Sequence, residues 1–318
     1  MTTSAKISVL LDHDGSADDF LSMVLLLLMD NVDLIGVSIT PADCYGENAV
    51  ETTLKLLSKA GRLDIPVGLG NLHGINAFPS EWRARPKILN ALPLLITIDT
   101  TASVSTVVSS QVLLTQKLKE AEAPVSILLT GPCTNLVQVL AQDPSLAQKI
   151  GSVVWMAGAI DVVGNVRTFN HDGTAEWNVF WDPISSAKLL QYSLPLTFIP
   201  LDATNAVPVT FDFLKRLALQ SNHFYSDLAG QFWATTIDTI PSYDYTYFMW
   251  DVLATSYLAI PEAFTTETIE IDILSSGPGA GRTYRKPGSG QWVTIATGVT
   301  KDHFYTYLLD KFNQNPTT

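Results

Sequence analysis

Short apolar runs alternate with longer, helix-like segments through the first two thirds of this 318-residue chain. Residues 7–11 are apolar and β-prone, which predicts a buried strand, and the Leu- and Met-rich residues 20–29 predict a buried helix. Further strands are expected at 32–40, 65–69, 125–130, 153–157 and 196–199, and further helices at 47–60, 105–121, 183–192 and after Gly131-Pro132. This alternation predicts an α/β fold, with an open, mainly parallel sheet flanked by helices.

The other segments follow different patterns. Residues 70–104 show no clean period and carry three prolines, which predicts a long irregular connection of the kind that often has a function. Residues 207–258 are expected to be mainly helical, 267–297 to form two or three antiparallel strands, and 301–312 to form a last helix. Because no linker or internal repeat interrupts the chain, we expect one domain over residues 1–318, with a small antiparallel C-terminal region.

An acidic cluster lies between the first expected strand and the first expected helix, and consists of Asp12, Asp14, Asp18 and Asp19. In open α/β sheets, ligands bind where strands end and helices begin. Four carboxylates this close repel one another unless protonation, helix amides or a cation offsets their charge. One or two of them could simply cap the helix. The whole pattern favours a catalytic or metal site, and oxygen ligands suit Ca²⁺ or Mg²⁺.

Other polar residues could complete such a site. Thr130 ends a strand before a Gly-Pro turn, which leaves its carbonyl free to face a cation, although an ordinary turn would look the same. Asp251 precedes an apolar helical stretch and is either a ligand or an N-cap. Asp43 follows the second strand, on the same side of the sheet.

Two loop segments carry candidates for ligand binding. Asn165, Glu176 and Asn178 flank Trp177, and such a group suits a hydroxyl-rich ligand, although an exposed loop would look similar. Trp82 lies in the long irregular connection, where a tryptophan can bind a ligand or anchor the loop on the core.

Charge and hydropathy exclude several classes of function. The formal net charge is −12 and no basic run is present, which argues against nucleic-acid binding. The longest apolar run, residues 21–29, is too short to cross a membrane. Cys44 and Cys133 do not form a metal or disulfide pattern, and we expect no signal peptide before the first strand. We therefore expect a cytoplasmic protein that binds a small molecule.

Taken together, these segments resemble the nucleoside hydrolase family, and within it the purine-preferring inosine–adenosine–guanosine type. The family signature is a strand followed by D-x-D-x-x-x-D-D, with Gly15-Ser16 here in place of the common Pro-Gly pair. The resemblance extends to about residue 260 and rests on further matching segments: Pro41 to Cys44, Phe78 to Arg83, Thr130 to Pro132, Asp172 to Pro183, and Trp250-Asp251. It implies a Rossmann-like fold and calcium-dependent hydrolysis of purine ribonucleosides to free base and ribose, as in purine salvage.

The resemblance also assigns the metal ligands. It implies that Ca²⁺ is held by the carboxylates of Asp14, Asp19 and Asp251 and by the backbone oxygen of Thr130. Asp14 would also be the general base, taking a proton from a water activated by the metal. Asp12 would support the site from behind.

The resemblance further implies how the sugar is held. Asp18 and Asn178 would bind the ribose 2′- and 3′-hydroxyls, and Asn165 and Glu176 the 5′-hydroxyl.

For the base, the resemblance implies that Asp43 faces the purine edge. Trp82 and Trp250 would cover its two faces, with Trp177 nearby. The pyrimidine-accepting branch has a histidine ahead of the last metal Asp, whereas residues 232–250 contain none here. His13 alternates with the carboxylates and is expected to face away from them. A homodimer is expected, with a homotetramer as the alternative.

Two rival interpretations remain open at this point. Asp12-x-Asp14-Gly15-Ser16 also resembles the opening of Mg²⁺-dependent haloacid-dehalogenase-like phosphatases, but the Gly-Asp dipeptide of their later motif occurs nowhere in this chain. A non-catalytic relative that binds a nucleoside or Ca²⁺ is the other alternative.

Overall fold

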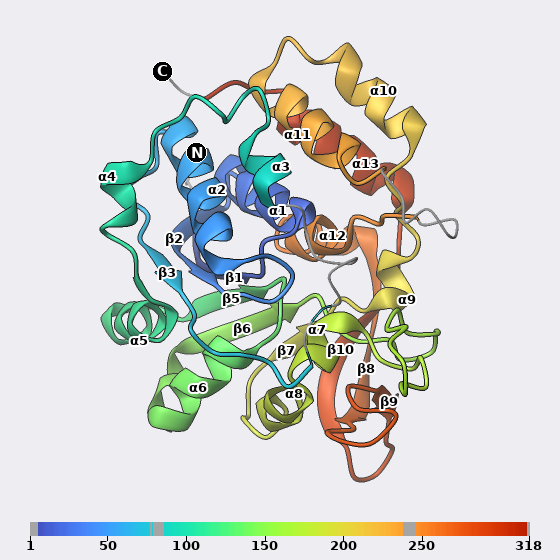
Figure 1. Ribbon diagram of the computed structural model, residues 1–318. Helices are drawn as coiled ribbons and strands as arrows, with labels where there is room; N and C mark the ends of the chain where they lie inside the picture. Colours follow the sequence, from blue (N-terminus) through green and yellow to red (C-terminus); the bar gives the residue numbers. More distant parts are fainter. Residues whose placement is uncertain (1–5, 77, 79–85, 238–245, 317–318) are drawn as a thin grey trace, which may run out of the picture.

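The computed structural model describes residues 6–76, 78, 86–237 and 246–316 of the chain. Its centre is one mixed sheet, in which ten strands of the described residues have the order β4-β3-β2-β1-β5-β6-β7-β10-β8-β9 (Figure 1). The strands are β1 (Ile7–His13), β2 (Val32–Ile39), β3 (Val67–Leu69), β4 (Val108–Ser109), β5 (Val125–Leu129), β6 (Ile150–Trp155), β7 (Leu196–Phe198), β8 (Phe264–Ile273), β9 (Thr283–Arg285) and β10 (Gln291–Val299).

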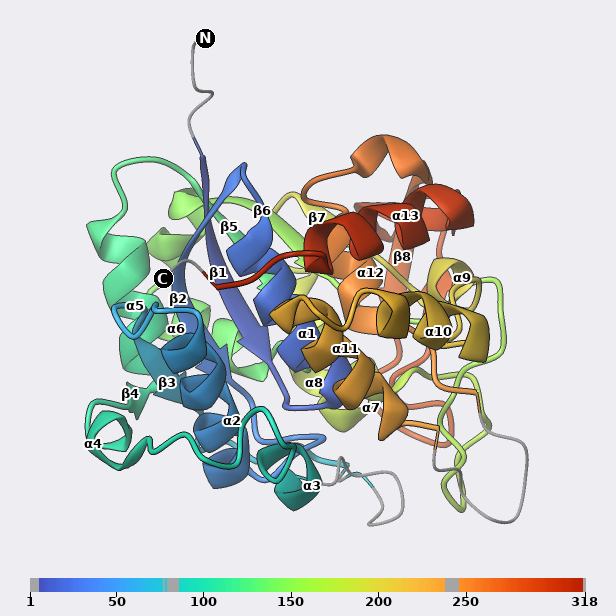
Figure 2. The same cartoon turned by 90° about the horizontal axis from the view of Figure 1, so that it is seen from above.

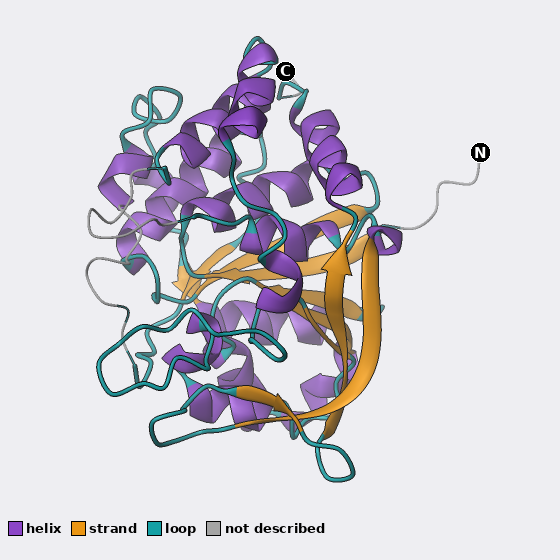
Figure 3. Cartoon of the chain, turned by 90° about the vertical axis from the view of Figure 1, so that its right-hand side faces the viewer, coloured by secondary structure: helices purple, strands orange, loops and turns teal. Residues whose placement is uncertain are grey.

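Helices cover both faces of this sheet (Figure 3). The α-helices are α1 (Ala17–Leu28), α2 (Gly46–Lys59), α3 (Pro86–Asn90), α4 (Thr101–Val104), α5 (Ser110–Glu120), α6 (Thr134–Gln142), α7 (Trp177–Trp181), α8 (Pro183–Leu189), α9 (Leu201–Thr204), α10 (Phe211–Leu219), α11 (Phe224–Ala234), α12 (Trp250–Ser256) and α13 (Lys301–Phe312). Two 3₁₀ turns, η1 (Pro144–Lys149) and η2 (Pro261–Ala263), complete the described elements. No described helix is long and apolar enough to cross a membrane.

The two faces of β1 belong to two separate hydrophobic cores. Val9 and Leu11 pack into the core under α1, α2 and α11 to α13, whereas Leu10 packs into the core of α5, α6 and α8. Figure 2 looks down on the first of these layers and shows α1, α11, α12 and α13 over the strands. Because β1 is buried on both faces, its middle residues Val9 to Leu11 form a continuous apolar run rather than an alternating pattern, as is typical of central parallel strands.

The expected α/β fold is confirmed, as is the antiparallel C-terminal region. From β4 to β7 the neighbouring strands pair in parallel, and β10 continues this order beside β7 before β8 and β9 pair antiparallel. The single domain over residues 1–318 stays a prediction.

Three local expectations were wrong. The helix expected at 105–121 begins only at Ser110, because Val108–Ser109 pair with β3 as strand β4. The expected irregular connection 70–104 contains the short helices α3 and α4, while its residues 77 and 79–85 lie outside the described part. The five-residue helix α7 was not expected, because it is too short to show a period and depends on a cap from Glu176.

Parallel pairing brings distant polar residues to one edge of the sheet. Asp12 in β1 lies beside Ser38 in β2 and Leu129 in β5. The strands therefore end at the same level, and the residues that follow them meet. Gly131 is needed for this approach, because a Cβ atom there would lie 2.8 Å from the Cβ of Asp14.

The core beside this edge can be tested at Phe20, which follows the acidic cluster. Its ring is 0% exposed and lies 5.4 Å from the His13 ring and 5.9 Å from the Phe232 ring, centroid to centroid. Phe20→Ala leaves a cavity and should lower the free energy of unfolding by about 3–5 kcal/mol in a denaturant titration. Leu219→Ala, at an 85% exposed position, should change it by less than about 0.5 kcal/mol. Equal unfolding midpoints for the two variants would contradict the assigned core.

Candidate active site

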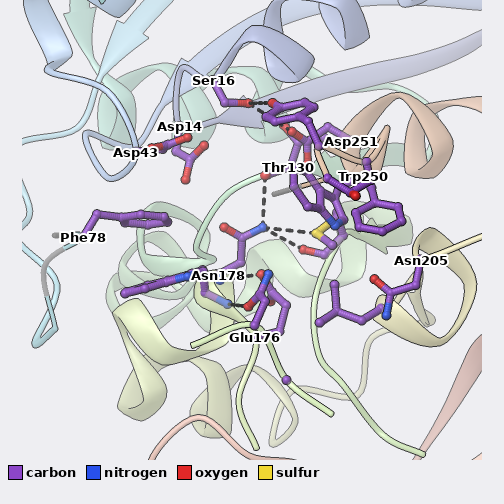
Figure 4. A pocket seen from close by; sticks show the side chains of 18 of the residues that line it. Asp14, Ser16, Asp43, Phe78, Thr130, Glu176, Asn178, Asn205, Trp250 and Asp251 are labelled. Atoms are coloured by element: carbon purple, nitrogen blue, oxygen red, sulfur yellow. Dashed lines mark hydrogen bonds between the residues drawn. The ribbon is translucent and has the colours of Figure 1, made fainter. Parts of the chain in front are cut away.

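A cavity of about 500 Å³ lies at the carboxyl edge of the parallel strands (Figure 4). The lining of this cavity contains most of the residues that the sequence indicated: Asp14, Asp43, Thr130, Asn165, Glu176, Trp177, Asn178, Trp250 and Asp251. Asp12, Asp18 and Asp19 do not line it, and each is at most 1% exposed. Trp82 lies outside the described residues. The structure thus brings together residues that are up to 237 positions apart along the chain, from 14 to 251.

The start of α1 holds Asp19 in a capping box. Ser16 N–H donates to Asp19 Oδ2 at 2.7 Å, and Asp19 N–H donates back to Ser16 Oγ at 3.3 Å. The other oxygen of Asp19, Oδ1, accepts a hydrogen bond from Thr130 Oγ1 at 2.6 Å. Asp19 therefore joins the end of β5 to the start of α1, directly beneath the cavity.

Asp18 ties α1 to α12. Its Oδ2 accepts the backbone N–H groups of Asp251 at 2.7 Å and Val252 at 3.1 Å. Its Oδ1 accepts the indole N–H of Trp233 at 3.0 Å. Asp18 in this arrangement positions Asp251, while the direct ribose contact expected of it stays a prediction.

Asp12 is buried and does not line the cavity, and the supporting role expected of it stays a prediction. Its Oδ1 accepts hydrogen bonds from Thr40 Oγ1 at 2.9 Å and Asn135 Nδ2 at 3.4 Å. His13 points to the opposite side, where its Nε2 lies 3.2 Å from Thr53 Oγ1 in α2. The alternation along β1 thus separates the histidine from the acidic cluster.

The loop after β6 and the start of α7 form a polar wall of the cavity, opposite the acidic residues that follow β1 (Figure 4). Glu176 caps α7 by accepting the backbone N–H of Asn178 at 2.8 Å, and it also accepts that of Gly158 at 3.0 Å. Asn178 Nδ2 donates to the Thr130 carbonyl at 3.1 Å. Asn165 Oδ1 accepts the backbone N–H of Trp177 at 3.1 Å. Each of these polar side chains is therefore held by the backbone before a ligand binds.

Aromatic side chains form the apolar walls. Phe78 stacks on Trp177, with ring centroids 4.5 Å apart and planes 22° from parallel. On the opposite side, Trp250 packs against Tyr247 at 4.7 Å and Phe248 at 5.7 Å. Figure 4 shows Phe78 and Trp250 across the cavity from each other. Such walls suit a flat, aromatic ligand.

Several residues of the cavity were not expected from the sequence: Phe78, Met156, Arg167, Asn205, Tyr247 and Phe248. Phe78, Tyr247 and Phe248 lie in or beside segments that the sequence did single out, so proximity was a usable signal for them. Met156 follows strand β6 and Asn205 follows the short helix α9, and only the folded structure reveals that they line the cavity.

Residues 9–306 match the family model described as inosine-uridine preferring nucleoside hydrolase. This chain belongs to the nucleoside hydrolase family. Members of this family are N-glycosyl hydrolases that act on ribonucleosides, and they typically depend on a metal ion.

Nucleoside hydrolases with different named preferences are similar to this chain. The crystal structure of an inosine-uridine preferring nucleoside hydrolase from Bacillus anthracis has 34% identity and a TM-score of 0.88, and covers 96% of this chain and 99% of its own. A pyrimidine-specific ribonucleoside hydrolase, RihA, from Shewanella woodyi is 26% identical over 85% of this chain and 84% of its own length. The purine-preferring ribonucleoside hydrolase from Gardnerella vaginalis shares the fold, with 22% identity, a TM-score of 0.80, and 96% of this chain and 98% of its own covered.

Burial and mutual repulsion disfavour the charged forms of the acidic residues in this nucleoside hydrolase. Burial raises the pKa of Asp14 well above its usual range, and the charges of Asp19 and Asp43 raise it further. Burial likewise raises the pKa of Asp251, with added repulsion from Asp19 and Asp18. A cation would relieve this repulsion because it favours the charged forms.

The donor set of Asp14, Asp19, Asp251 and the Thr130 carbonyl fits a hard cation, since every donor is an oxygen. As the side chains stand, no three His, Cys, Asp or Glu residues in the described part form a metal cluster. Instead, hydroxyls occupy part of the set: Thr130 Oγ1 donates to Asp19, and Ser16 Oγ lies 3.4 Å from Asp251 Oδ2. The chemistry of the donors therefore fits a metal ion, while their present partners are protein groups.

The raised pKa values of the buried acids lead to a prediction about how stability depends on pH. Burial raises the pKa of Asp12 and of Asp18 to about 7, so the folded protein binds these protons more tightly than the unfolded chain. Without a cation, these groups should lower the free energy of unfolding as pH rises from about 4 to about 7. A bound cation stabilises the charged forms, so Ca²⁺ should raise the melting temperature more at about pH 7 than at about pH 5.

Thermal unfolding in Ca²⁺ and in chelator measures this effect at both pH values. Asp251→Asn should reduce the calcium-dependent gain, whereas Asp302→Asn, on the exposed side of α13, should leave it unchanged. A calcium-dependent rise in melting temperature that is the same at both pH values would contradict this prediction.

Proposed function

We propose that this nucleoside hydrolase cleaves the N-glycosidic bond of purine ribonucleosides in a calcium-dependent reaction with Asp14 as the general base. The observation that supports this most directly is a single cavity with an acidic floor, a polar wall and two aromatic walls. The floor suits water activation, the polar wall suits ribose and the aromatic walls suit a base.

Asp14 is well placed to take a proton. It lines the cavity directly after β1, and its carboxylate is a strong proton acceptor because burial and Asp19 raise its pKa. The cation would be held by Asp14, Asp19, Asp251 and the Thr130 carbonyl. When bound, it would supply positive charge that makes water at the site more acidic.

The ribose would lie against Asn178, Glu176 and Asn165. Their backbone hydrogen bonds fix them in advance, which lowers the cost of ordering the site when substrate binds. Bond cleavage would develop positive charge on the sugar ring, as in glycoside hydrolysis generally. The buried carboxylates around C1′ would stabilise that charge.

The base would stack on Trp250 with Asp43 at its edge, and Trp82 is proposed for the second face. No described residue of the cavity lining is a histidine, so no imidazole is available there to protonate a leaving base. Purines carry a readily protonated imidazole nitrogen of their own, and pyrimidines do not. This chemistry favours purine substrates, whereas the named preferences of similar proteins include both classes of base. A cytoplasmic location and a homodimeric or homotetrameric assembly stay predictions.

Asp14→Asn tests the general base. The amide keeps the size and one oxygen but accepts no proton, so kcat should fall by roughly two to four orders of magnitude while KM changes little. Ribose release from inosine is the measurement, and Asp302→Asn serves as the exposed control. Near-native kcat in Asp14→Asn would remove Asp14 from the proposed role.

Substrate preference is tested with a panel of inosine, adenosine, guanosine, uridine and cytidine, with and without chelator. We expect kcat/KM to be much higher for the purines, and chelator to abolish turnover. Trp250→Ala should lower purine kcat/KM by about 10- to 100-fold, in line with a stacking energy of about 1–3 kcal/mol. Trp292→Ala, at a 66% exposed tryptophan in β10, should have no effect.

Each outcome of the panel has a distinct meaning. Similar kcat/KM for inosine and uridine would refute the purine preference and leave hydrolysis intact. Absence of ribose release from every nucleoside would refute the proposed activity. Release of phosphate from a phosphomonoester instead would favour the phosphatase alternative.

A further inference from the structure

We infer that His171 is a positioning residue. Its neutral imidazole holds the loop between β6 and α7, which carries Asn165 and Glu176, against the connection between the C-terminal strands β8 and β9. This inference rests on the proposed function, because it assigns His171 an effect on the 5′ end of the nucleoside. His171 does not line the cavity and lies in the connection between β6 and α7.

Both ring nitrogens of His171 have partners of fixed polarity. The side chain is 3% exposed. Its Nε2 lies 3.0 Å from the Ala280 carbonyl oxygen, which can only accept. Its Nδ1 lies 3.0 Å from the backbone N–H of Gly173, which can only donate. The neutral tautomer with hydrogen on Nε2 satisfies both contacts, and no other protonation state does.

The contacts join two segments that are about 110 residues apart. Asp172 N–H donates to the Pro278 carbonyl at 2.9 Å, beside the His171 bond to Ala280. Gly173 turns the chain at φ +82°, a backbone conformation that glycine adopts without strain. In Figure 1 the lime-green loop lies beside the connection between β8 and β9. His171 thus fixes one tip of the loop on the sheet's antiparallel extension.

Two contacts connect this part of the loop to Asn165 and Glu176, which are proposed to bind the ribose. The Ala175 carbonyl accepts the backbone N–H of Asn165 at 3.0 Å, and Glu176 follows directly as the cap of α7. The His171 ring also meets Phe180 in α7 edge-on, with centroids 4.8 Å apart. A shift of His171 would therefore move Asn165 and Glu176, the two residues proposed for the 5′-hydroxyl.

Charged side chains lie close to the ring or to its neighbours in the loop. Asp172 Oδ1 lies 3.9 Å from Nδ1 but already accepts the N–H and hydroxyl of Thr174, at 3.0 and 2.6 Å. Arg282 acts on Asp172 from the β8–β9 connection, and Arg167 lies close to Gly173. A protonated ring would set an N–H group against the N–H of Gly173 and lose that contact.

His171→Phe tests the inference, because it keeps a ring against Phe180 and removes both hydrogen bonds. Loss of two such bonds should raise KM for inosine about tenfold, with a smaller change in kcat. 5′-Deoxyinosine lacks the hydroxyl that Asn165 and Glu176 would hold, so its KM should hardly change. His171→Asn can still accept the Gly173 N–H, so its KM for inosine should lie between that of the native enzyme and that of His171→Phe. His303→Asn, in α13, is the matched histidine control.

A long-range ¹H–¹⁵N spectrum of native enzyme in mildly alkaline buffer provides a second readout. It should show hydrogen on Nε2 and none on Nδ1 of His171, and the opposite tautomer would overturn the inference. Equal KM increases for inosine and 5′-deoxyinosine would also overturn it, since they would indicate a general structural effect. If His171→Phe does not fold, the comparison of His171→Asn with native enzyme decides by the same criterion.

The two proposals fail in distinguishable ways. Native enzyme that releases no ribose from any nucleoside overturns the proposed function and the role of His171 with it. Active native enzyme and unchanged kinetics in both His171 variants overturn only the role of His171.

Discussion

Repulsion between buried carboxylates is the constraint on which this active-site arrangement depends. Acidic side chains at one sheet edge lie where little water reaches them, so each needs a donor or a cation. The fold supplies donors one by one: a capping box and a threonine hydroxyl for Asp19, helix amides and an indole for Asp18, and an amide for Asp12. Burial and repulsion from neighbouring carboxylates raise the pKa values of Asp14 and Asp251, and both residues line the cavity.

This arrangement divides the site into parts with different supports. Asp14 and Thr130 follow β1 and β5, inside a sheet that is buried on both faces. The polar wall of Asn165, Glu176 and Asn178, proposed to bind ribose, is held by backbone hydrogen bonds, by the cap of α7 and by contacts of its loop to the β8–β9 connection. Under the proposed mechanism, hydrolysis needs an accurately placed base and water, whereas the sugar would bind to a loop that is held at a few points.

The named preferences of similar proteins show that one fold serves several bases. An inosine-uridine preferring enzyme, a pyrimidine-specific enzyme and a purine-preferring enzyme all match most of this chain. Asp14 and Thr130 follow strand ends, which change little when loops change. We therefore expect the choice of base to depend on the aromatic walls, which among the described residues include Phe78, Tyr247, Phe248 and Trp250.

The sequence by itself determined the alternating α/β order, most element positions and the acidic cluster, because periodicity and local spacing are properties of neighbouring residues. It also indicated the acidic and most of the polar residues of the cavity lining, because polar residues that follow buried strands must meet at the carboxyl edge of a parallel sheet. Only the tertiary structure decided that Asp18 bonds to α12 and Trp233 instead of lining the cavity, and that Phe78 stacks on Trp177. These contacts join segments far apart in the chain, and no local pattern records which partner a buried side chain will reach.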